Sequence, residues 1–171
     1  MSGFTENRAS DASERPGGEP VVLTWGAAGA MLPLVGRIAT DVVRCHDRLA
    51  RLQPERDRLD RLRRSLAWPD RARRYALQEE TTAADKDLQE TTAELEGLGV
   101  ALLHGPTGLV GFPTVVNDRP AYFSWRPGEE KLAFWNYADD LLRRPVPSAW
   151  MRPAKEKERE RRGRGKIDSR K

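Results

Sequence analysis

Few side chains in this 171-residue sequence could support catalysis or bind a metal. The one cysteine, Cys45, is followed directly by one of the two histidines, His46, and the second histidine is His104. No cysteine or acid stands at a spacing that would complete a closed metal site with them. Adjacent positions on a helix point about 100° apart, so Cys45 and His46 do not readily share a ligand. The sequence therefore predicts packing roles for these side chains and no bound cofactor.

Motifs for phosphate binding and for nucleophilic catalysis are also missing from the sequence. Gly26, Gly29 and Gly36 do not follow a strand, as the glycines of a nucleotide-binding fingerprint do. Ser124 has no histidine near it in the sequence, and only two histidines are available to complete a catalytic triad. These gaps favour a protein that is not an enzyme.

Aromatic residues supply the clearest candidate for a binding surface. Strand alternation places Tyr122 and Ser124 on one face and Phe123 and Trp125 on the other, and the second pair is more typical of a core. An exposed stacking platform would then consist of Tyr122 with Phe134 or Trp135. The candidate residues for contact with a ligand or partner are Tyr122, Trp125, Arg126, Glu129, Trp135 and Asn136.

Positive charge is concentrated at the C-terminus. Residues 155–171 contain nine lysines and arginines against four acids, which leaves the rest of the chain at a net charge of −1 out of a total of +4. A solvated tail is the ordinary interpretation, but such a run also neutralises phosphates non-specifically. We expect any nucleic-acid binding to be weak, salt-sensitive and lost on truncation after Ala154. The candidate contacts are Arg159, Arg161, Arg162, Arg164 and Lys166.

The elements that must position these residues begin with two helices. Apolar residues recur on a seven-residue repeat, and a second series follows the sequence Trp68-Pro69-Asp70, which predicts a turn. Thr24 is a suitable N-cap, and Pro33 and Pro54 predict kinks or local breaks. The first series comprises Val35, Ile38, Val42, Cys45, Leu49, Leu52, Leu59 and Leu66, and the second Leu77, Thr81, Ala84, Leu88, Thr91, Leu95 and Leu98.

Opposite charges favour antiparallel pairing of these helices. Residues 37–74 contain twelve arginines and six acids, whereas residues 75–96 contain seven acids and Lys86 as their one basic residue. We therefore expect arginines of the first helix to face acids of the second and to be covered by them. Arg56 and Arg63 interrupt the first apolar series, which predicts a tip that is looser or that meets acidic groups.

Short apolar runs behind the helices predict a β-meander over residues 100–136. The expected strands are 100–103, 109–116, 121–125 and 132–135, with an edge strand or bulge at Pro113 and turns at 117–118 and 126–131. So few strands need a second layer to cover their apolar face. The predicted fold class is therefore α+β: a long antiparallel, coiled-coil-like helical hairpin, residues 25–98, with a small antiparallel β-sheet at its base.

Composition predicts one domain, residues 21–150, between two disordered tails, residues 1–20 and 151–171. A single cysteine suits a reducing cytoplasm. The uncharged stretch from Val21 to Gly36 contains Pro33 and three glycines and is shorter than the roughly 20 residues of a membrane span. We expect a cytoplasmic protein without a membrane role.

Four motifs resemble those of the bacterial DUF2203 family, which is uncharacterised. They are Gly108 to Pro113, Ser124 to Glu129, Phe134 to Asn136, and the stretch from Leu23-Thr24 to Met31-Leu32-Pro33. The resemblance spans about residues 21–147 and implies a charged helical hairpin ahead of the strand motifs.

Three positions depart from the pattern of that family. Gly111 stands where the family has Asp, Ser124 where it has Cys, and Asn136 where it has His. An acid, a thiol and an imidazole together would suit a metal or catalytic site. If the family has such chemistry, the resemblance implies that this member has lost it.

Three functions therefore stay open. The leading one is a non-enzymatic interaction or scaffold module with an unknown protein partner, and a homodimer is compatible with it. The second is a degenerate member of a metal-binding or enzymatic family, and the third is an RNA- or ribosome-associated accessory protein that acts through the basic tail. Convergence of positions 111, 124 and 136 around a cleft would distinguish the second from the first.

Overall fold

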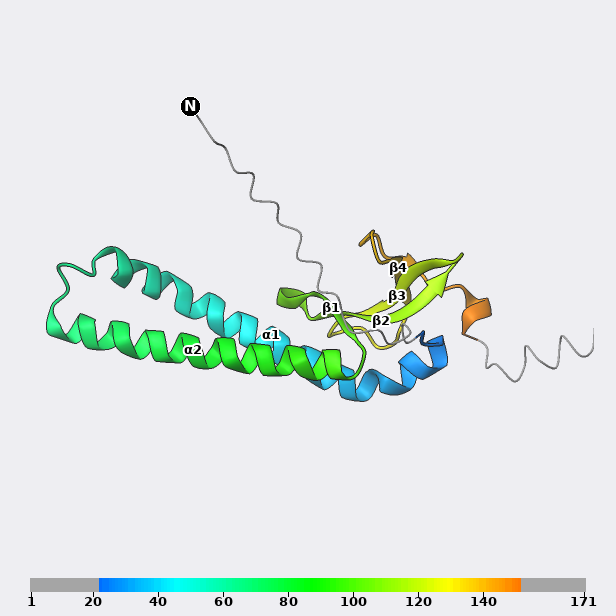
Figure 1. Ribbon diagram of the computed structural model, residues 1–171, viewed down its shortest axis with the longest axis horizontal. Helices are drawn as coiled ribbons and strands as arrows, with labels where there is room; N and C mark the ends of the chain where they lie inside the picture. Colours follow the sequence, from blue (N-terminus) through cyan, green and yellow to red (C-terminus); the bar gives the residue numbers. More distant parts are fainter. Residues whose placement is uncertain (1–21, 152–171) are drawn as a thin grey trace, which may run out of the picture.

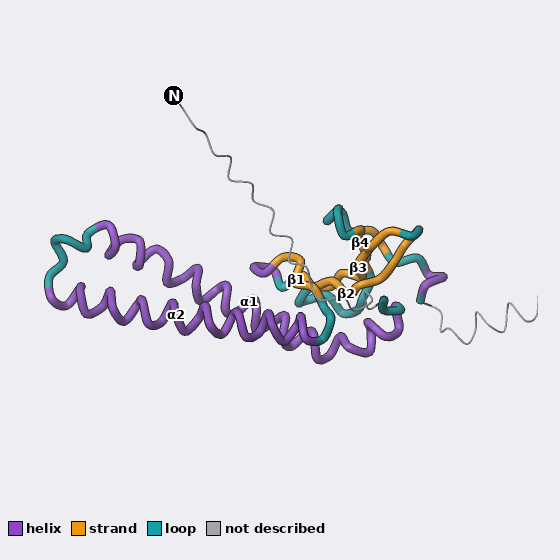
Figure 2. Tube along the Cα trace, viewed as in Figure 1, coloured by secondary structure: helices purple, strands orange, loops and turns teal. Residues whose placement is uncertain are grey.

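Two long helices extend side by side beyond one end of a small β-sheet in the computed structural model, which describes residues 22–151 (Figures 1 and 2). The helices are α1, Trp25–Arg61, and α2, Trp68–Gly97, and the sheet has five strands. The predicted α+β class is confirmed, as is the helical hairpin. The predicted tails lie outside the described residues, apart from Met151.

Local sequence signals account for the course of α1. The Thr24 hydroxyl accepts a hydrogen bond from the Ala27 amide at 3.2 Å, which caps the helix as predicted. The helix runs through Pro33 and Pro54, so neither proline breaks it, although its N-terminal part is bent relative to the rest (Figure 1). Because α1 ends at Arg61, Leu66 lies in the connection and not in the helix as predicted.

The two apolar series meet across the hairpin. Of the second series, Leu77, Thr81, Ala84 and Leu95 are buried. Near the distal end, Leu59, Leu66 and Leu77 form a separate small cluster. Leu66 therefore keeps its predicted core role even though the helix has ended.

Ion pairs across the hairpin differ from the prediction. Among the described residues, Arg48 with Asp87, at 3.4 Å, is the one pair that joins an arginine of α1 to an acid of α2. In the closer pairs the arginine belongs to α2 and the acid to α1: Arg73 contacts Glu55 at 2.8 Å, and Arg74 contacts Asp60 at 2.6 Å. The acids in the last turns of α1 lie opposite arginines at the start of α2, so acids of α2 do not cover the arginines of α1 as predicted, apart from Arg48.

The sheet is an antiparallel meander in the order β1-β2-β3-β4-β5. It starts one residue later than predicted and includes a fifth strand that the sequence did not indicate. Leu132 lies outside the fourth strand but is buried. The strands are β1, Ala101–His104; β2, Leu109–Val116; β3, Arg119–Trp125; β4, Phe134–Tyr137; and β5, Arg144–Pro145, and there are two 3₁₀ turns, η1, Gly105–Thr107, and η2, Ser148–Trp150.

The turn between β2 and β3 forms where predicted. Asn117 and Asp118 have φ values of 51° and 58°. Two successive left-handed residues match the twist of a two-residue hairpin, and Asn and Asp tolerate that conformation. This turn sets the register in which Gly111 pairs with Ser124.

Pro113 is accommodated within an interior strand, not an edge strand. β1 pairs only with the first residues of β2, and the register shift lies in β1, between Leu102 and His104. Beyond it, the Pro113 carbonyl accepts a hydrogen bond from the Leu23 amide at 2.7 Å. In a strand the N–H and C=O of one residue point the same way, so the missing N–H of Pro113 lies on the side that β1 leaves open.

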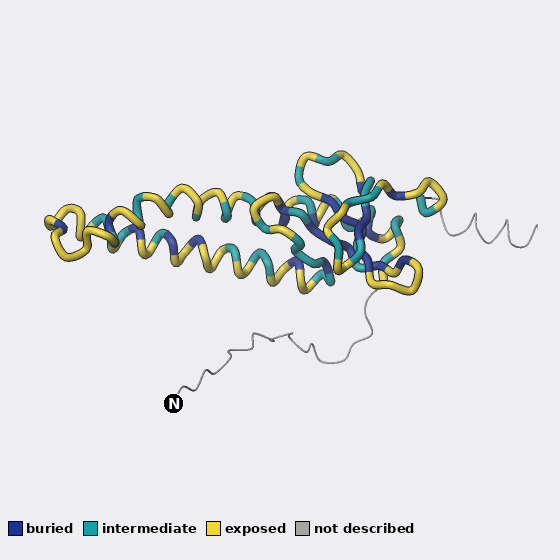
Figure 3. The backbone as a smooth tube through the Cα atoms, turned by 90° about the horizontal axis from the view of Figure 1, so that it is seen from above, coloured by how far each residue is buried: buried dark blue, intermediate teal, exposed yellow. Residues whose placement is uncertain are grey.

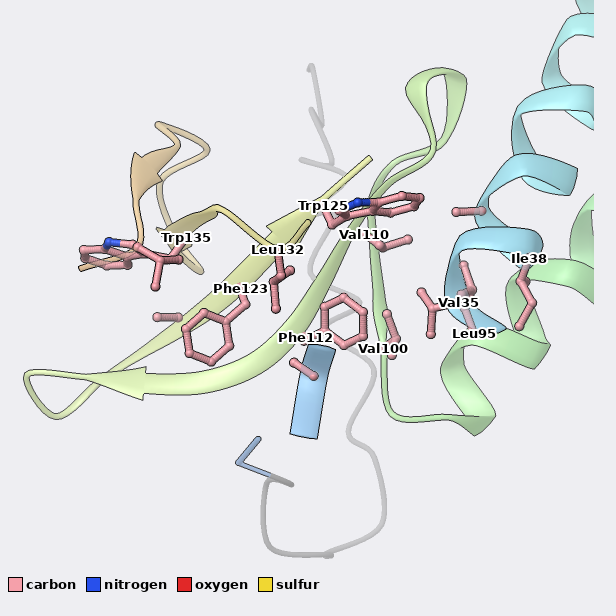
Figure 4. Packing of buried hydrophobic residues seen from close by; sticks show 14 of the residues in the cluster. Val35, Ile38, Leu95, Val100, Val110, Phe112, Phe123, Trp125, Leu132 and Trp135 are labelled. Atoms are coloured by element: carbon pink, nitrogen blue, oxygen red, sulfur yellow. The ribbon is translucent and has the colours of Figure 1, made fainter. Parts of the chain in front are cut away.

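The core lies between one face of the sheet and the base of the hairpin (Figure 4). Val110, Phe112 and Trp125 face α1, where Val35 and Val42 are fully buried. A Cβ at Gly36 would lie 3.2 Å from the Trp125 ring, so this glycine allows the close contact between helix and indole. Buried residues concentrate at the base, whereas most of the projecting hairpin is exposed (Figure 3).

One helix, α1, is long and apolar enough to be compared with a membrane span. Its buried side chains, which include Val35, Ile38 and Val42, are those that contact the sheet and α2. Packing at the base involves only part of this segment, since 28% of its most apolar window is buried.

Candidate functional site

Positions 111, 124 and 136 lie on one face of the sheet, opposite the core. Gly111 on β2 pairs with Ser124 on β3, and Asn136 on β4 pairs with Tyr122 on β3. Paired residues of neighbouring strands project from the same face, as do residues two apart on a strand. The three positions that depart from the family pattern are therefore neighbours in space.

No cleft opens between these positions in the described part of the chain. A Cβ at Gly111 would lie 2.8 Å from Cγ of Tyr122 and 3.0 Å from Cδ1 of Leu103, so the Tyr122 ring occupies the place of a side chain at 111. Ser124 is 0% exposed and Asn136 is 1% exposed. The three positions share one face of the sheet, and the Tyr122 ring takes the place of a side chain at 111.

A bidentate ion pair covers the Ser124 end of this face. Arg143 donates to both carboxylate oxygens of Glu129, at 2.7 and 2.8 Å. The same guanidinium donates to the hydroxyl of Ser124 at 3.2 Å and to its carbonyl at 3.1 Å, and stacks 4.4 Å over the Phe134 ring. Since both ionic side chains are mostly buried, this pair clamps the loop before β5 onto the sheet.

The turn after β3 places Glu129 for this role. Gly128 has a φ of +96°, which favours glycine, and brings the Glu129 amide within 3.2 Å of the Arg126 carbonyl. The Trp125 indole donates to the Glu129 carbonyl at 2.9 Å. The turn thus joins Trp125 in the core to Glu129 on the opposite face.

The electrostatics of the clamp do not suit acid–base catalysis. Burial alone would raise the pKa of Glu129, but the hydrogen bonds and charge of Arg143, with the Arg126 amide and charge, leave the pKa below its usual value. A carboxylate held ionised in this way is a poor proton acceptor and donor near neutral pH. The buried Ser124 hydroxyl faces Arg143, which is no general base.

One polar atom on this face lacks a partner in the described residues. Asn136 donates from Nδ2 to the Tyr137 carbonyl at 2.8 Å, whereas its buried Oδ1 accepts no hydrogen bond. A single amide oxygen without neighbouring ligands does not make a metal site.

Some of the other candidate residues lie in the core and some lie on the surface. Trp125 and Trp135 are 7% and 9% exposed, and Trp135 packs with Trp150 and Tyr137. Arg126 is exposed and contacts Glu129 at 3.3 Å. Tyr122 is half-buried and does share a face with Phe134, but Arg143 covers that second ring. The candidate set therefore does not form an exposed aromatic platform.

A shallow groove of about 490 Å³ lies between the helices near Cys45. Burial, followed by Asp87 and Asp41, raises the pKa of the Cys45 thiol against the opposing effect of Arg48, so the thiol stays protonated. Within residues 22–151, no three His, Cys, Asp or Glu side chains are grouped so that they could hold a metal ion. His46 lies elsewhere, against Gly105 of η1.

The distal end of the hairpin presents exposed aromatic and apolar side chains that the sequence analysis did not predict. We define the hairpin tip as residues 56–75, which contain eight arginines and three aspartates. Trp68, Tyr75 and Leu62 are 75%, 65% and 49% exposed there. The sequence pattern around Trp68 predicts a turn, but it did not predict that this side chain is exposed. The position of Trp68, between two apolar series and outside both, could have indicated it.

Comparison with known proteins places the chain in a family. The profile described as "Uncharacterized conserved protein (DUF2203)" matches residues 21–144. The chain belongs to the DUF2203 family. The match contains the hairpin, the sheet and the Glu129–Arg143 clamp, so the DUF2203 region coincides with nearly all of the described structure. Comparisons with curated proteins and with solved structures give no match.

Proposed function

We propose that this protein is a non-enzymatic interaction module that contacts its partner through the hairpin tip, with the sheet as its base. The observation that carries this proposal is the 75% exposure of Trp68 at the distal end of the hairpin. Tryptophan, tyrosine and arginine are the residues that most often dominate binding energy at interfaces. The tip presents all three, whereas the sheet face opposite the core is closed by the Arg143 clamp.

The test is affinity capture from native lysate with three full-length baits. One bait is the natural chain, one carries Trp68→Ala and Tyr75→Ala, and the matched control carries Leu141→Ala and Leu142→Ala. The control removes two side chains of comparable exposure, 60% and 63%, from the base. Equal melting temperatures of the three baits would establish that none is unfolded.

The proposal predicts a component retained by the natural and control baits and depleted at least about tenfold by the tip variant. Both proteins and nucleic acids would be quantified in the eluates. An identical set of captured components on all three baits would contradict a role for the tip.

A second candidate, a degenerate member of a metal-binding or enzymatic family, is favoured by the convergence of positions 111, 124 and 136. In this chain those positions are glycine, serine and asparagine, and the Tyr122 ring takes the place of a side chain at 111. We expect purified protein to contain no stoichiometric transition metal by elemental analysis. About one zinc or iron per chain, lost on changing His46 or His104, would overturn that expectation.

A further inference from the structure

Uncompensated positive charge distinguishes the hairpin tip from the rest of the described surface. Of its eight arginines, Arg73 contacts Glu55 and Glu80, and Arg74 contacts Asp60. Within residues 22–151, no carboxylate lies within ion-pair distance of the other six. These are Arg56, Arg58, Arg61, Arg63, Arg64 and Arg71, and all but Arg56 are exposed.

Two aromatic rings lie on one face of α2 within this charged segment. Trp68 and Tyr75 are seven residues apart, so they are two turns and about 10.5 Å apart along the helix axis on the same side. Arg71 lies between them, and its Nε donates to the Leu66 carbonyl at 2.9 Å. Trp68 and Tyr75 therefore share one side of α2, and the Arg71 guanidinium is held at the N-terminal end of the helix, against the Leu66 carbonyl.

We propose that the hairpin tip binds single-stranded nucleic acid, with Trp68 and Tyr75 stacked on unpaired bases and the tip arginines on phosphates. Bases offer flat faces to aromatic rings, and guanidinium groups match phosphate geometry. This inference rests on the proposed function and names its partner. It differs from the tail-based expectation because the site belongs to the folded hairpin.

The geometry favours a polynucleotide over a lipid surface. A bilayer that meets the hairpin end-on contacts only its extreme end, whereas Tyr75 lies two turns back along its side. A flexible strand lying along α2 reaches both rings and the arginines between and around them. An acidic protein would meet the charge, but unpaired bases meet the charge with their phosphates and also offer flat faces to the exposed aromatic rings.

The experiment is a fluorescence anisotropy titration of the full-length chain with labelled oligouridylate, oligothymidylate, a duplex and an acidic peptide. Vesicles of phosphatidylcholine and phosphatidylglycerol provide a separate sedimentation arm. To remove the candidate tail contacts, all proteins carry Arg159→Gln, Arg161→Gln, Arg162→Gln, Arg164→Gln and Lys166→Gln. The aromatic test variant adds Trp68→Ala and Tyr75→Ala, with Leu141→Ala and Leu142→Ala as its control.

A charge test uses two matched pairs of substitutions on the same background. Arg63→Gln with Arg64→Gln changes the tip, and Arg37→Gln with Arg44→Gln makes the same change of charge near the base. The tip pair should lower the slope of log affinity against log salt by about 1.4 units, since each of two single-strand phosphate contacts contributes about 0.7. The base pair should leave the slope unchanged.

We expect both single strands to bind, the duplex to bind more weakly, and the aromatic variant to lose at least about tenfold in affinity for the single strands. Binding that is equal in the aromatic variant and its control would overturn the inference. So would a preference for duplex, acidic peptide or vesicles over single strands. If single strands fail to bind while capture from lysate still depends on Trp68 and Tyr75, the interaction module stands and only its partner changes.

Discussion

At the scale of single residues, the ion pair between Glu129 and Arg143 holds the loop before β5 against the sheet face opposite the core. Their two hydrogen bonds, with those to Ser124, anchor the chain between β4 and β5. We expect Arg143→Ala to lower the free energy of unfolding at pH 7 by about 2 kcal/mol, because a mostly buried carboxylate loses its charged donors. Chemical denaturation of both proteins provides the measurement.

The pH dependence gives a second readout of the clamp. Because the pKa of Glu129 is lowered in the folded state, its contribution to stability is present above its usual value of 4.5 and is lost as the pH falls through the folded pKa. The stability difference between the natural chain and Arg143→Ala should therefore shrink below pH 4.5. A difference that is constant from pH 7 to pH 3 would contradict this assignment.

Gly111 and Tyr122 are matched in this chain. Gly111→Ala should lower the free energy of unfolding by about 1–3 kcal/mol, since its Cβ meets the rigid base of the Tyr122 ring at 2.8 Å. Adding Tyr122→Ala should make the Gly111→Ala substitution nearly neutral, as a thermal denaturation cycle of the four proteins would measure. Equal costs of Gly111→Ala in both backgrounds would mean that the ring does not occupy this space.

Residue-level prediction from the sequence succeeded where a strand alternates. The alternation assigned Phe123 and Trp125 to the core and Tyr122 and Ser124 to the other face, as the structure has them. Arg143 was missed because it follows the expected meander, and its pairing with Glu129 depends on a fifth strand with only two residues. So short a strand leaves no periodic pattern to detect.

At the scale of helices and strands, Leu77 stabilises the packing of α1 against α2 in the distal part of the hairpin. It is fully buried against Leu59 and Leu66, in a cluster separate from the main core. Leu77→Ala should cost about 2–4 kcal/mol locally, whereas Leu62→Ala, at a half-exposed neighbouring position, should cost little. Hydrogen exchange should report faster opening of residues 56–75 in the first variant and an unchanged sheet in both.

The seven-residue repeat predicted which helix faces meet, but segment charge did not predict which residues form ion pairs. The charge of residues 37–74 was taken as that of one helix, but this segment includes both the end of α1 and the start of α2. Those two regions face each other across the connection, so Arg73 and Arg74 pair with acids of α1. Pairing depends on position along the hairpin, which a net charge for each segment does not record.

The exposed members of these pairs add little to stability. Arg73 and Glu55 keep 41% and 36% of their side-chain surface, so solvent screens the interaction. Arg73→Ala should therefore change the free energy of unfolding much less than Leu77→Ala does in denaturant titrations. A loss comparable to that of Leu77→Ala would show that ions, and not carbon, hold the distal hairpin.

The whole molecule consists of a packed base and a hairpin that projects from it. The core and the Glu129–Arg143 clamp lie at the base, and the exposed Trp68 and Tyr75 lie at the tip. Figure 3 shows the buried backbone concentrated at the base and the projecting hairpin mostly exposed. Such a shape holds a small contact surface at a fixed distance from a stable domain. The proposed contact through the hairpin tip relies on this separation.

Hydrogen–deuterium exchange of the full-length protein with and without a saturating single-stranded oligonucleotide tests the central claim most directly. The backbone amides of residues 56–75 should gain protection, while those of residues 121–137 should not change. Protection confined to the sheet or to residues 152–171, with the hairpin tip unaffected, would contradict the account.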